Sequence, residues 1–142
     1  MKPIVLLLSV LTALTARPAW AETHEVQMYT RNASGPMIYE PEFLRIAPGD
    51  EVRFIPVQPG HNAATIDGMT PEGAAPFKSQ INEDYTVTLT VPGRYGIKCS
   101  PHFAMGMVML IEVGNSPETT FPADLPRRAQ DRFDAILAAN PE

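Results

Sequence analysis

Apolar and polar residues alternate in several short runs along this chain, most clearly between residues 85 and 91. There Tyr85, Val87, Leu89 and Val91 fall on one side of an extended backbone, and threonines fall on the other side. A period of two predicts a strand with one face in the core and one face in water. Strands are predicted for residues 25–30, 43–46, 51–57, 85–91, 95–98 and 107–113.

The residues between these runs favour turns. Pro48-Gly49 and Pro92-Gly93 separate neighbouring runs, and Pro-Gly pairs are typical of tight turns. Many short strands joined by turns predict an all-β fold, an antiparallel sandwich or barrel. Residues 62–82 carry scattered glycines and prolines and predict a long ordered loop with room for one short helix.

The period changes near the C-terminus. Apolar residues recur at helical spacing in Ala129, Phe133, Ile136 and Leu137, and Pro126 occupies a plausible first helical position. Asn140-Pro141 ends the pattern. We therefore predict a helical extension over about residues 117–140 that packs on the strands.

The first 21 residues predict a signal peptide. Lys2 precedes an apolar run over residues 4–14, and Ala19-Trp20-Ala21 is the small-residue pattern of a cleavage site. A membrane anchor is the alternative, but it needs about 20 unbroken apolar residues, and this run ends at Thr15. We therefore expect an exported protein with one domain over residues 22–142 and no stable membrane insertion.

Charge and cysteine usage narrow the functions. The 142-residue chain has 11 basic and 16 acidic residues, and removal of Lys2 and Arg17 leaves 9 basic ones, a net charge of −7. This balance argues against nucleic acid as a partner. The single cysteine, Cys99, cannot form an internal disulfide, so it is a free thiol, an intermolecular bridge or a metal ligand. A buried, inert cysteine is the simplest alternative.

Residues 98–107 gather a thiol, an imidazole and two thioethers between two predicted strands: Cys99, His102, Met105 and Met107. Soft sulfur ligands select copper(I), and two histidines, one cysteine and a weak axial methionine form a blue-copper site. Each residue alone is more often core or surface than ligand, but the four together favour a metal. Either methionine could take the axial position.

A second histidine must come from elsewhere in the chain. His61 follows Pro59-Gly60 just after a predicted strand, so a neighbouring strand can bring it beside Cys99. His24 is the competitor, but it lies close to the expected mature N-terminus, where chains fray. We therefore predict His61 as the second imidazole ligand.

Apolar residues surround His102 in the sequence. Pro101 would stiffen the loop by fixing its own φ, which suits a site whose geometry changes little with oxidation state. These apolar residues are either ordinary core packing or an exposed hydrophobic patch around His102, and the patch is the slightly favoured interpretation. Its members are Met37, Pro101, Phe103, Ala104 and Met105.

These motifs closely resemble those of the pseudoazurins, periplasmic type I copper proteins, over essentially the whole mature chain. Pro59-Gly60-His61-Asn62 is similar to the family's first-histidine segment, and Cys99-Ser100-Pro101-His102 followed by Met107 matches its ligand loop. The resemblance implies a Greek-key cupredoxin sandwich, Met107 as the axial ligand and one copper ion per chain cycling between Cu(II) and Cu(I). It also implies a monomeric electron carrier of the periplasm, not an enzyme.

The resemblance further implies supporting residues and partners. Asn62 would brace the ligand loops, and a backbone N–H near Pro101 or Asn62 would contact the Cys99 sulfur. Electrons would reach the protein from a cytochrome or membrane complex. They would leave through the His102 edge to nitrite reductase or another respiratory reductase, which docks on an apolar patch ringed by lysines.

The sequence departs from that docking pattern. The mature chain is acidic, and Pro59 stands where a ring lysine is expected. Arg31, Lys78 and Lys98 could still form a local basic rim, because steering depends on the geometry of a patch more than on net charge. Ordinary solvated surface explains these three residues equally well.

Three other functions fit part of the pattern. Copper carriage or buffering needs an open, exchangeable site, which a buried ligand plane disfavours. Hydrolysis by a Cys-His pair needs an accessible thiol and an orienting carboxylate, and the 98–107 loop contains no Asp or Glu. Zinc is chemically possible, although a thioether is a poor zinc ligand.

Overall fold

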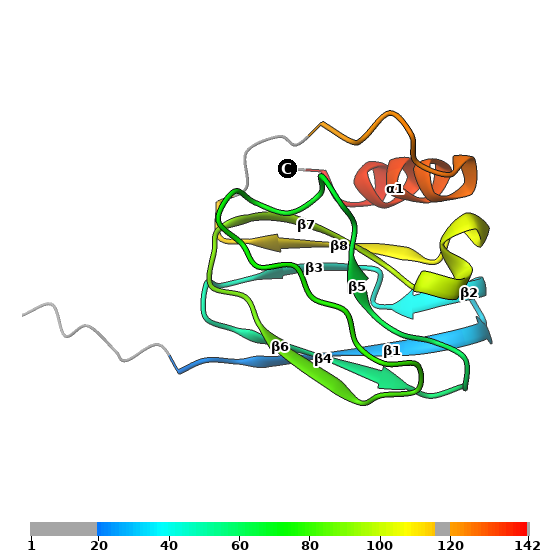
Figure 1. The fold of residues 1–142 in the computed structure, drawn as a ribbon, viewed down its shortest axis with the longest axis horizontal. Coiled ribbons are helices and arrows are strands. Elements are labelled where there is room, and N and C mark those ends of the chain that lie inside the picture. Colours follow the sequence, from blue (N-terminus) through cyan, green and yellow to red (C-terminus); the bar gives the residue numbers. More distant parts are fainter. Residues whose placement is uncertain (1–19, 116–119, 142) are drawn as a thin grey trace, which may run out of the picture.

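The structure, a computed structural model, describes residues 20–115 and 120–141 and shows two four-stranded sheets packed face to face (Figure 1). The first sheet has the order β2 (Gly35–Glu40), β1 (Thr23–Asn32), β4 (Glu51–Pro56) and β6 (Tyr85–Thr88). The second has the order β3 (Phe43–Ile46), β8 (Val108–Val113), β7 (Gly93–Lys98) and β5 (Ala64–Thr65). The predicted β-sandwich is therefore present.

The prediction of purely antiparallel sheets is wrong. β1 pairs with β4 in parallel, and β3 pairs with β8 in parallel. The reason is the crossover between sheets: after β2 the chain enters the second sheet as β3 and returns to the first sheet as β4 on the far side of β1. Parallel neighbours need such a long connection, whereas a tight hairpin joins antiparallel ones.

Two strands were not predicted, and both depart from simple alternation. β2 contains Met37 at φ 55°, which interrupts the extended pattern. β5 has only two residues, which pair with Ile97 and Lys98 of β7 inside the segment predicted as a loop. Residues 62–82, described throughout, contain no helix.

The core lies between the two sheets and follows the predicted faces. Val26 and Phe54 from one sheet meet Ile97, Met109 and Ile111 from the other, and all five are fully buried. Along residues 85–91 the apolar side chains are buried or half-buried while Thr86, Thr88 and Thr90 are exposed, as the alternation predicts. Burial of these side chains supplies most of the favourable free energy of folding.

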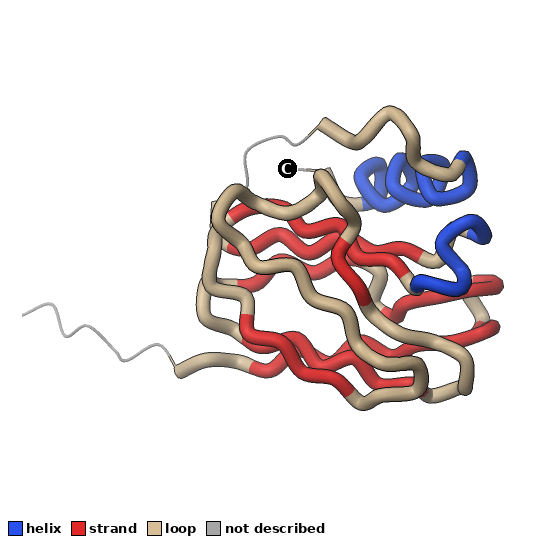
Figure 2. Tube along the Cα trace, viewed as in Figure 1, coloured by secondary structure: helices blue, strands red, loops and turns tan. Residues whose placement is uncertain are grey.

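Helix α1 (Arg127–Ala139) packs against β8 and the turn that follows β7 (Figure 2). It buries Ala129, Phe133 and Ile136, which confirms the predicted apolar face. The helix is shorter than the predicted extension of 117–140, because residues 120–126 are not helical and residues 116–119 lie outside the described part. Prolines interrupt the segment before α1, and Phe121 stacks on Phe133 at a ring separation of 5.2 Å instead of joining the helix.

The predicted signal peptide falls mostly outside the described residues, which begin at Trp20. Within the described ranges, no helix has the length and apolar character needed to cross a bilayer.

Two arginines hold the carboxylate of Glu112 on β8. Arg94 of β7 donates to it at 2.6 Å, and Arg45 of β3 donates at 2.9 Å. Arg45 also donates to the carbonyls of Asn140 and Pro141, so the same network fixes the chain after α1. Burial raises the pKa of Glu112, but the bonds and charges of the two arginines outweigh it and hold the pKa below its ordinary value.

We predict that Glu112→Gln lowers the free energy of unfolding at pH 7 by about 3 kcal/mol, because two guanidinium groups lose their buried anion. Since the folded-state pKa is depressed, this stabilisation is present above about pH 4.3 and is lost as the pH falls through the folded value. Urea unfolding at pH 7 and pH 3 measures both points. Glu25→Gln is the control, because its pair with Arg53 is exposed on the surface. Equal losses in the two variants would contradict the role of Glu112.

Candidate metal centre

Gly60 turns the chain after β4 and directs His61 into the protein. It has φ 95°, a conformation that glycine adopts without strain, and its N–H donates to Asn82 Oδ1 at 2.6 Å. His61 is fully buried, and its Nε2 lies 3.0 Å from Thr30 Oγ1 of β1. This contact leaves Nδ1 of the ring directed toward the other ligand loop.

The predicted ligand loop is a six-residue 3₁₀ helix, η1 (Ser100–Met105), between β7 and β8. Cys99 precedes it, and Gly106 ends it at φ 86°. A Cβ on Gly106 would come 2.8 Å from the carbonyl oxygen of Arg128, so only glycine allows α1 to approach this closely. The N–H of Cys99 donates to the Met107 carbonyl at 3.0 Å, which closes the loop at its base.

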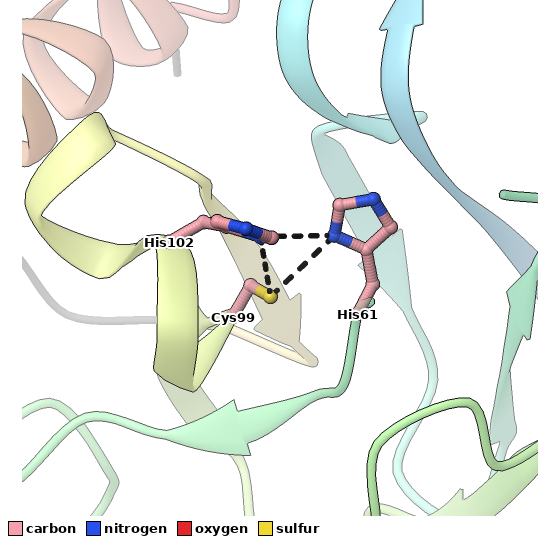
Figure 3. Close-up of side chains that lie close together, drawn as sticks. All are labelled: His61, Cys99 and His102. Atoms are coloured by element: carbon pink, nitrogen blue, oxygen red, sulfur yellow. Dashed lines mark hydrogen bonds between the residues drawn. The ribbon is translucent and has the colours of Figure 1, made fainter. Parts of the chain in front are cut away.

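Three ligand atoms from these loops form a small triangle (Figure 3). Cys99 Sγ lies 3.7 Å from His61 Nδ1 and 3.5 Å from His102 Nδ1, and the two nitrogens are 3.1 Å apart. A point equidistant from the three atoms is about 2.0 Å from each, close to the bond lengths of about 2.0–2.3 Å that imidazole and thiolate make to such metals. The triangle therefore fits one small, soft metal ion without rearrangement.

The two candidate axial methionines are in different surroundings. Met107 is fully buried in the same core cluster as Cys99, and its N–H donates to the His102 carbonyl. Met105 is 43% exposed and lies on the surface beside α1. The structure thus places Met107, and not Met105, in the buried surroundings of the triangle.

Burial controls the protonation of these groups in the absence of a metal. It raises the pKa of the Cys99 thiol, although the backbone N–H groups of Asn62 and His102 oppose the rise by bonding to the sulfur. Burial, together with the nearby His102 ring, lowers the pKa of His61. Both shifts favour neutral donors, so a cation at the centre of the triangle is what would stabilise the thiolate.

Known proteins share this fold and much of this sequence. Residues 26–114 match the family described as copper binding proteins, plastocyanin/azurin family. The chain is 49% identical to pseudoazurin from Paracoccus pantotrophus over 126 residues, 87% of each chain. The crystal structure of pseudoazurin from Methylobacterium extorquens AM1 superposes with a TM-score of 0.78 at 34% identity and covers 83% of this chain and 98% of that one. Native pseudoazurin from Hyphomicrobium denitrificans superposes with a TM-score of 0.72 at 30% identity, and the match covers 84% of this chain and 99% of that one.

The chain belongs to the plastocyanin/azurin family of copper proteins. It has the cupredoxin fold and is a pseudoazurin-type blue-copper electron carrier, not an enzyme. A carrier of this kind exchanges electrons with redox partners. Its donor set of two imidazoles, one thiolate and one thioether suits copper in both oxidation states.

Asn62 connects the two ligand loops of this blue-copper carrier. Its Oδ1 accepts from the Ser100 N–H at 2.7 Å, and its Nδ2 donates to Ser100 Oγ and to the Ser79 carbonyl, both at 3.1 Å. Its own carbonyl accepts from the buried Tyr39 hydroxyl at 2.7 Å. The resemblance implied the bracing role of Asn62, but sequence reasoning missed Tyr39 and Thr30, because nothing local marks a contact with a residue 23 or 31 positions away.

His24 lies far from the triangle, although the reason given from the sequence is wrong. The residue does not fray: it pairs with Val52 in the sheet, and its Nε2 lies 2.9 Å from Asp50 Oδ2. Thr30, six residues further along β1, contacts His61, and six strand residues span about 20 Å. Strand length, and not disorder, therefore separates His24 from Cys99.

The residues of the expected docking patch gather where η1 meets the surface. Pro101, Ala104 and Met105 are exposed, and His102 and Phe103 are half-buried. Met37 is half-buried and packs on the core cluster that contains Cys99 and Met107. Lys98 Nζ lies 5.0 Å from the centre of the Phe103 ring, so one basic group borders this apolar surface directly.

We predict that Asn62→Ala loosens the copper centre, because the Ser100 N–H and the Ser79 carbonyl lose their partner inside the protein. The free energy of unfolding should fall by about 2–3 kcal/mol, and copper should be released to a chelator about tenfold faster or more. Urea unfolding and the loss of absorbance with time measure the two effects. Asn32→Ala removes a comparable side chain at the end of β1, where its hydrogen bonds with Glu40 and Ser34 are exposed to solvent, and serves as the control. Unchanged release from Asn62→Ala would contradict the bracing role.

Proposed function

We propose that this protein carries single electrons through the periplasm, holding one copper ion with His61, Cys99, His102 and Met107 and delivering electrons to a respiratory reductase such as nitrite reductase. The observation that carries the ligand assignment is the triangle of Sγ and two Nδ1 atoms, with Met107 buried in the same core cluster as Cys99. The predicted signal peptide supports the periplasmic location, and the similarity to pseudoazurins supports the kind of partner.

Copper would supply the one-electron couple, and the protein's own groups would fix the geometry around it. Thr30 holds His61, and Asn62 holds the Cys99 loop. The sulfur and the two nitrogens therefore already surround a point from which each is at metal-bonding distance. A site built this rigidly needs little rearrangement when the charge at its centre changes by one. That property favours fast electron exchange.

Burial separates this function from the alternatives. Cys99 and His61 are completely buried, so a substrate cannot reach the thiol, and a copper acceptor could not displace these ligands without opening the loop. Of the four proposed ligands only His102 is partly exposed. Its ring edge is therefore the shortest route for an electron between the centre and a docked partner.

We predict that Cys99→Ser abolishes the intense red-region absorption of the copper(II) protein, because the thiolate bond to the metal is lost. Met107→Gln should stay coloured with a changed reduction potential. Absorption spectra and voltammetry of the copper-loaded variants measure the two effects. Met105→Gln is the matched control and should leave both unchanged. A Cys99→Ser protein that remains blue would refute the assignment.

The charges around the ligand loop favour an acidic partner despite the negative net charge. Five basic side chains in the described part of the chain lie within 4 Å of a carboxylate. The basic side chains without such a partner there are Arg31, Lys78, Lys98 and Arg128.

These four unpaired cations lie at the copper end of the molecule. Arg31 follows Thr30, Lys98 precedes Cys99, and Arg128 touches the end of η1 through its backbone. Lys78 and Lys98 line one pocket of about 420 Å³, and Met105 and Arg128 line another beside α1, together with Asp131. Arg128 thus extends the basic rim onto the C-terminal helix, which the sequence did not suggest.

We predict that Arg128→Glu slows electron transfer to nitrite reductase by about five- to tenfold at low ionic strength, because a steering cation becomes an anion. The electron-transfer rates of the variant and of the unchanged protein should converge in high salt, because salt screens the charges. Stopped-flow mixing of the reduced carrier with the reductase over a range of salt concentrations measures the effect. Arg127→Glu makes the same change of charge, but the Arg127 side chain is almost fully exposed and does not line the pocket beside α1. An equal loss in both variants would point to net charge and not to a local rim.

A further inference from the structure

The chain enters β1 at the end of the molecule opposite to the turn between β7 and β8 (Figure 1), and the carboxylate of Asp50 is bound to this start of the strand. Asp50 is 7% exposed and accepts three hydrogen bonds. Its Oδ1 accepts from the backbone N–H of Glu22 at 3.0 Å, while Oδ2 lies 2.9 Å from His24 Nε2 and accepts from the Ala47 N–H at 3.1 Å. These bonds hold the start of β1 against the turn between β3 and β4.

This carboxylate has no permanent cation beside it. The hydrogen bonds from Glu22, His24 and Ala47 hold the pKa of Asp50 below its ordinary value, so the group is ionised at neutral pH. No lysine or arginine among the described residues pairs with it, and His24 carries charge only when protonated. A buried anion without a charged partner costs free energy, so a full positive charge beside it would stabilise the fold.

We propose that cleavage of the Ala21–Glu22 bond creates this missing cation, an α-ammonium on Glu22 that pairs with Asp50. A signal-peptidase-type endoprotease would add water across the peptide C–N bond, so that Ala21 leaves as a carboxylate and the Glu22 nitrogen becomes an amine that takes up a proton. The inference rests on the proposed export.

The nitrogen is already in position before cleavage. The Glu22 carbonyl accepts from the Glu51 N–H at 2.8 Å, and β1 begins at the next residue, so this end of the chain is fixed by the sheet. On the other side of the bond Ala21 is exposed, and Trp20 is 87% exposed, so both residues extend away from the core. Cleavage would therefore replace a neutral N–H donor by a charged one without moving it.

This arrangement links maturation to stability. Before cleavage, the Glu22 nitrogen is an uncharged donor to the Asp50 carboxylate; afterwards both the donor and the acceptor of this bond carry a full charge. β1 lies between β2 and β4 and contributes Thr30 to the support of His61. A precursor that lacks this last contact is easier to keep unfolded for export, and the mature domain gains it only after the leader is removed.

A double-mutant cycle tests the pairing in the copper-loaded domain. Two chains are prepared, one that begins at Glu22 and one that retains Ala21, each with Asp50 or with Asp50→Asn. The chain that begins at Glu22 should have a folding equilibrium constant about tenfold larger, and the advantage should disappear with Asp50→Asn. Asp67→Asn, which changes an exposed carboxylate elsewhere, should preserve it.

A second measurement covers the case in which Asp50→Asn does not fold. Acetylation of the Glu22 amine keeps an N–H donor but removes the charge, so it should reproduce the loss seen with Ala21 retained. Equal stability of the free and acetylated chains would overturn the pairing. The mass of the protein recovered from the periplasm tests the processing separately: a chain that starts at Glu22 supports it, and a different start or a retained leader overturns the export step and not the measured pairing.

Discussion

The hydrogen bonds between Asn62 and Ser100 are the constraint on which the copper centre depends. They join a loop that leaves the first sheet to a loop that connects β7 and β8, and the two loops share no covalent neighbour. Because His61 and Cys99 stand next to these two residues, the amide fixes the distance between imidazole and thiol. The sandwich core fixes the points where the two loops leave their strands, and Asn62 sets the distance between the loops themselves.

The sequence predicts the parts of this structure that depend on local patterns and misses those that depend on contacts between distant residues. β3 and the apolar face of α1 follow from local periodicity, since side-chain direction along a short element depends only on its neighbours. β5 has two residues and exists because Ile97 and Lys98 lie beside it, so no local pattern could reveal it. The parallel pairing of β1 with β4 likewise depends on where the chain crosses between sheets, which alternation does not record.

The candidate site shows the same division. Cys99, His102 and Met107 were predictable because few functions place a thiol, an imidazole and a thioether on one short loop. Thr30 and Tyr39 were not, because threonine and tyrosine are ordinary strand residues and become supports only through contacts with His61 and Asn62. Chemistry that needs rare residue types is visible in a sequence, while support from common residue types requires the fold.

The net charge of the chain does not predict the charge of the docking surface, because most of its charges are paired or distant from that surface. Most basic side chains distant from the ligand loops are neutralised by carboxylates within 4 Å, as Arg53 is by Asp84. Within about 10 Å, the screening length at moderate salt, a partner experiences the nearest unpaired charges and not the sum over the molecule. Arg128 lies at the end of η1 only because Gly106 lets α1 come into contact there. The C-terminal helix thus acts on the electrostatics of the copper end as well as on the packing of β8.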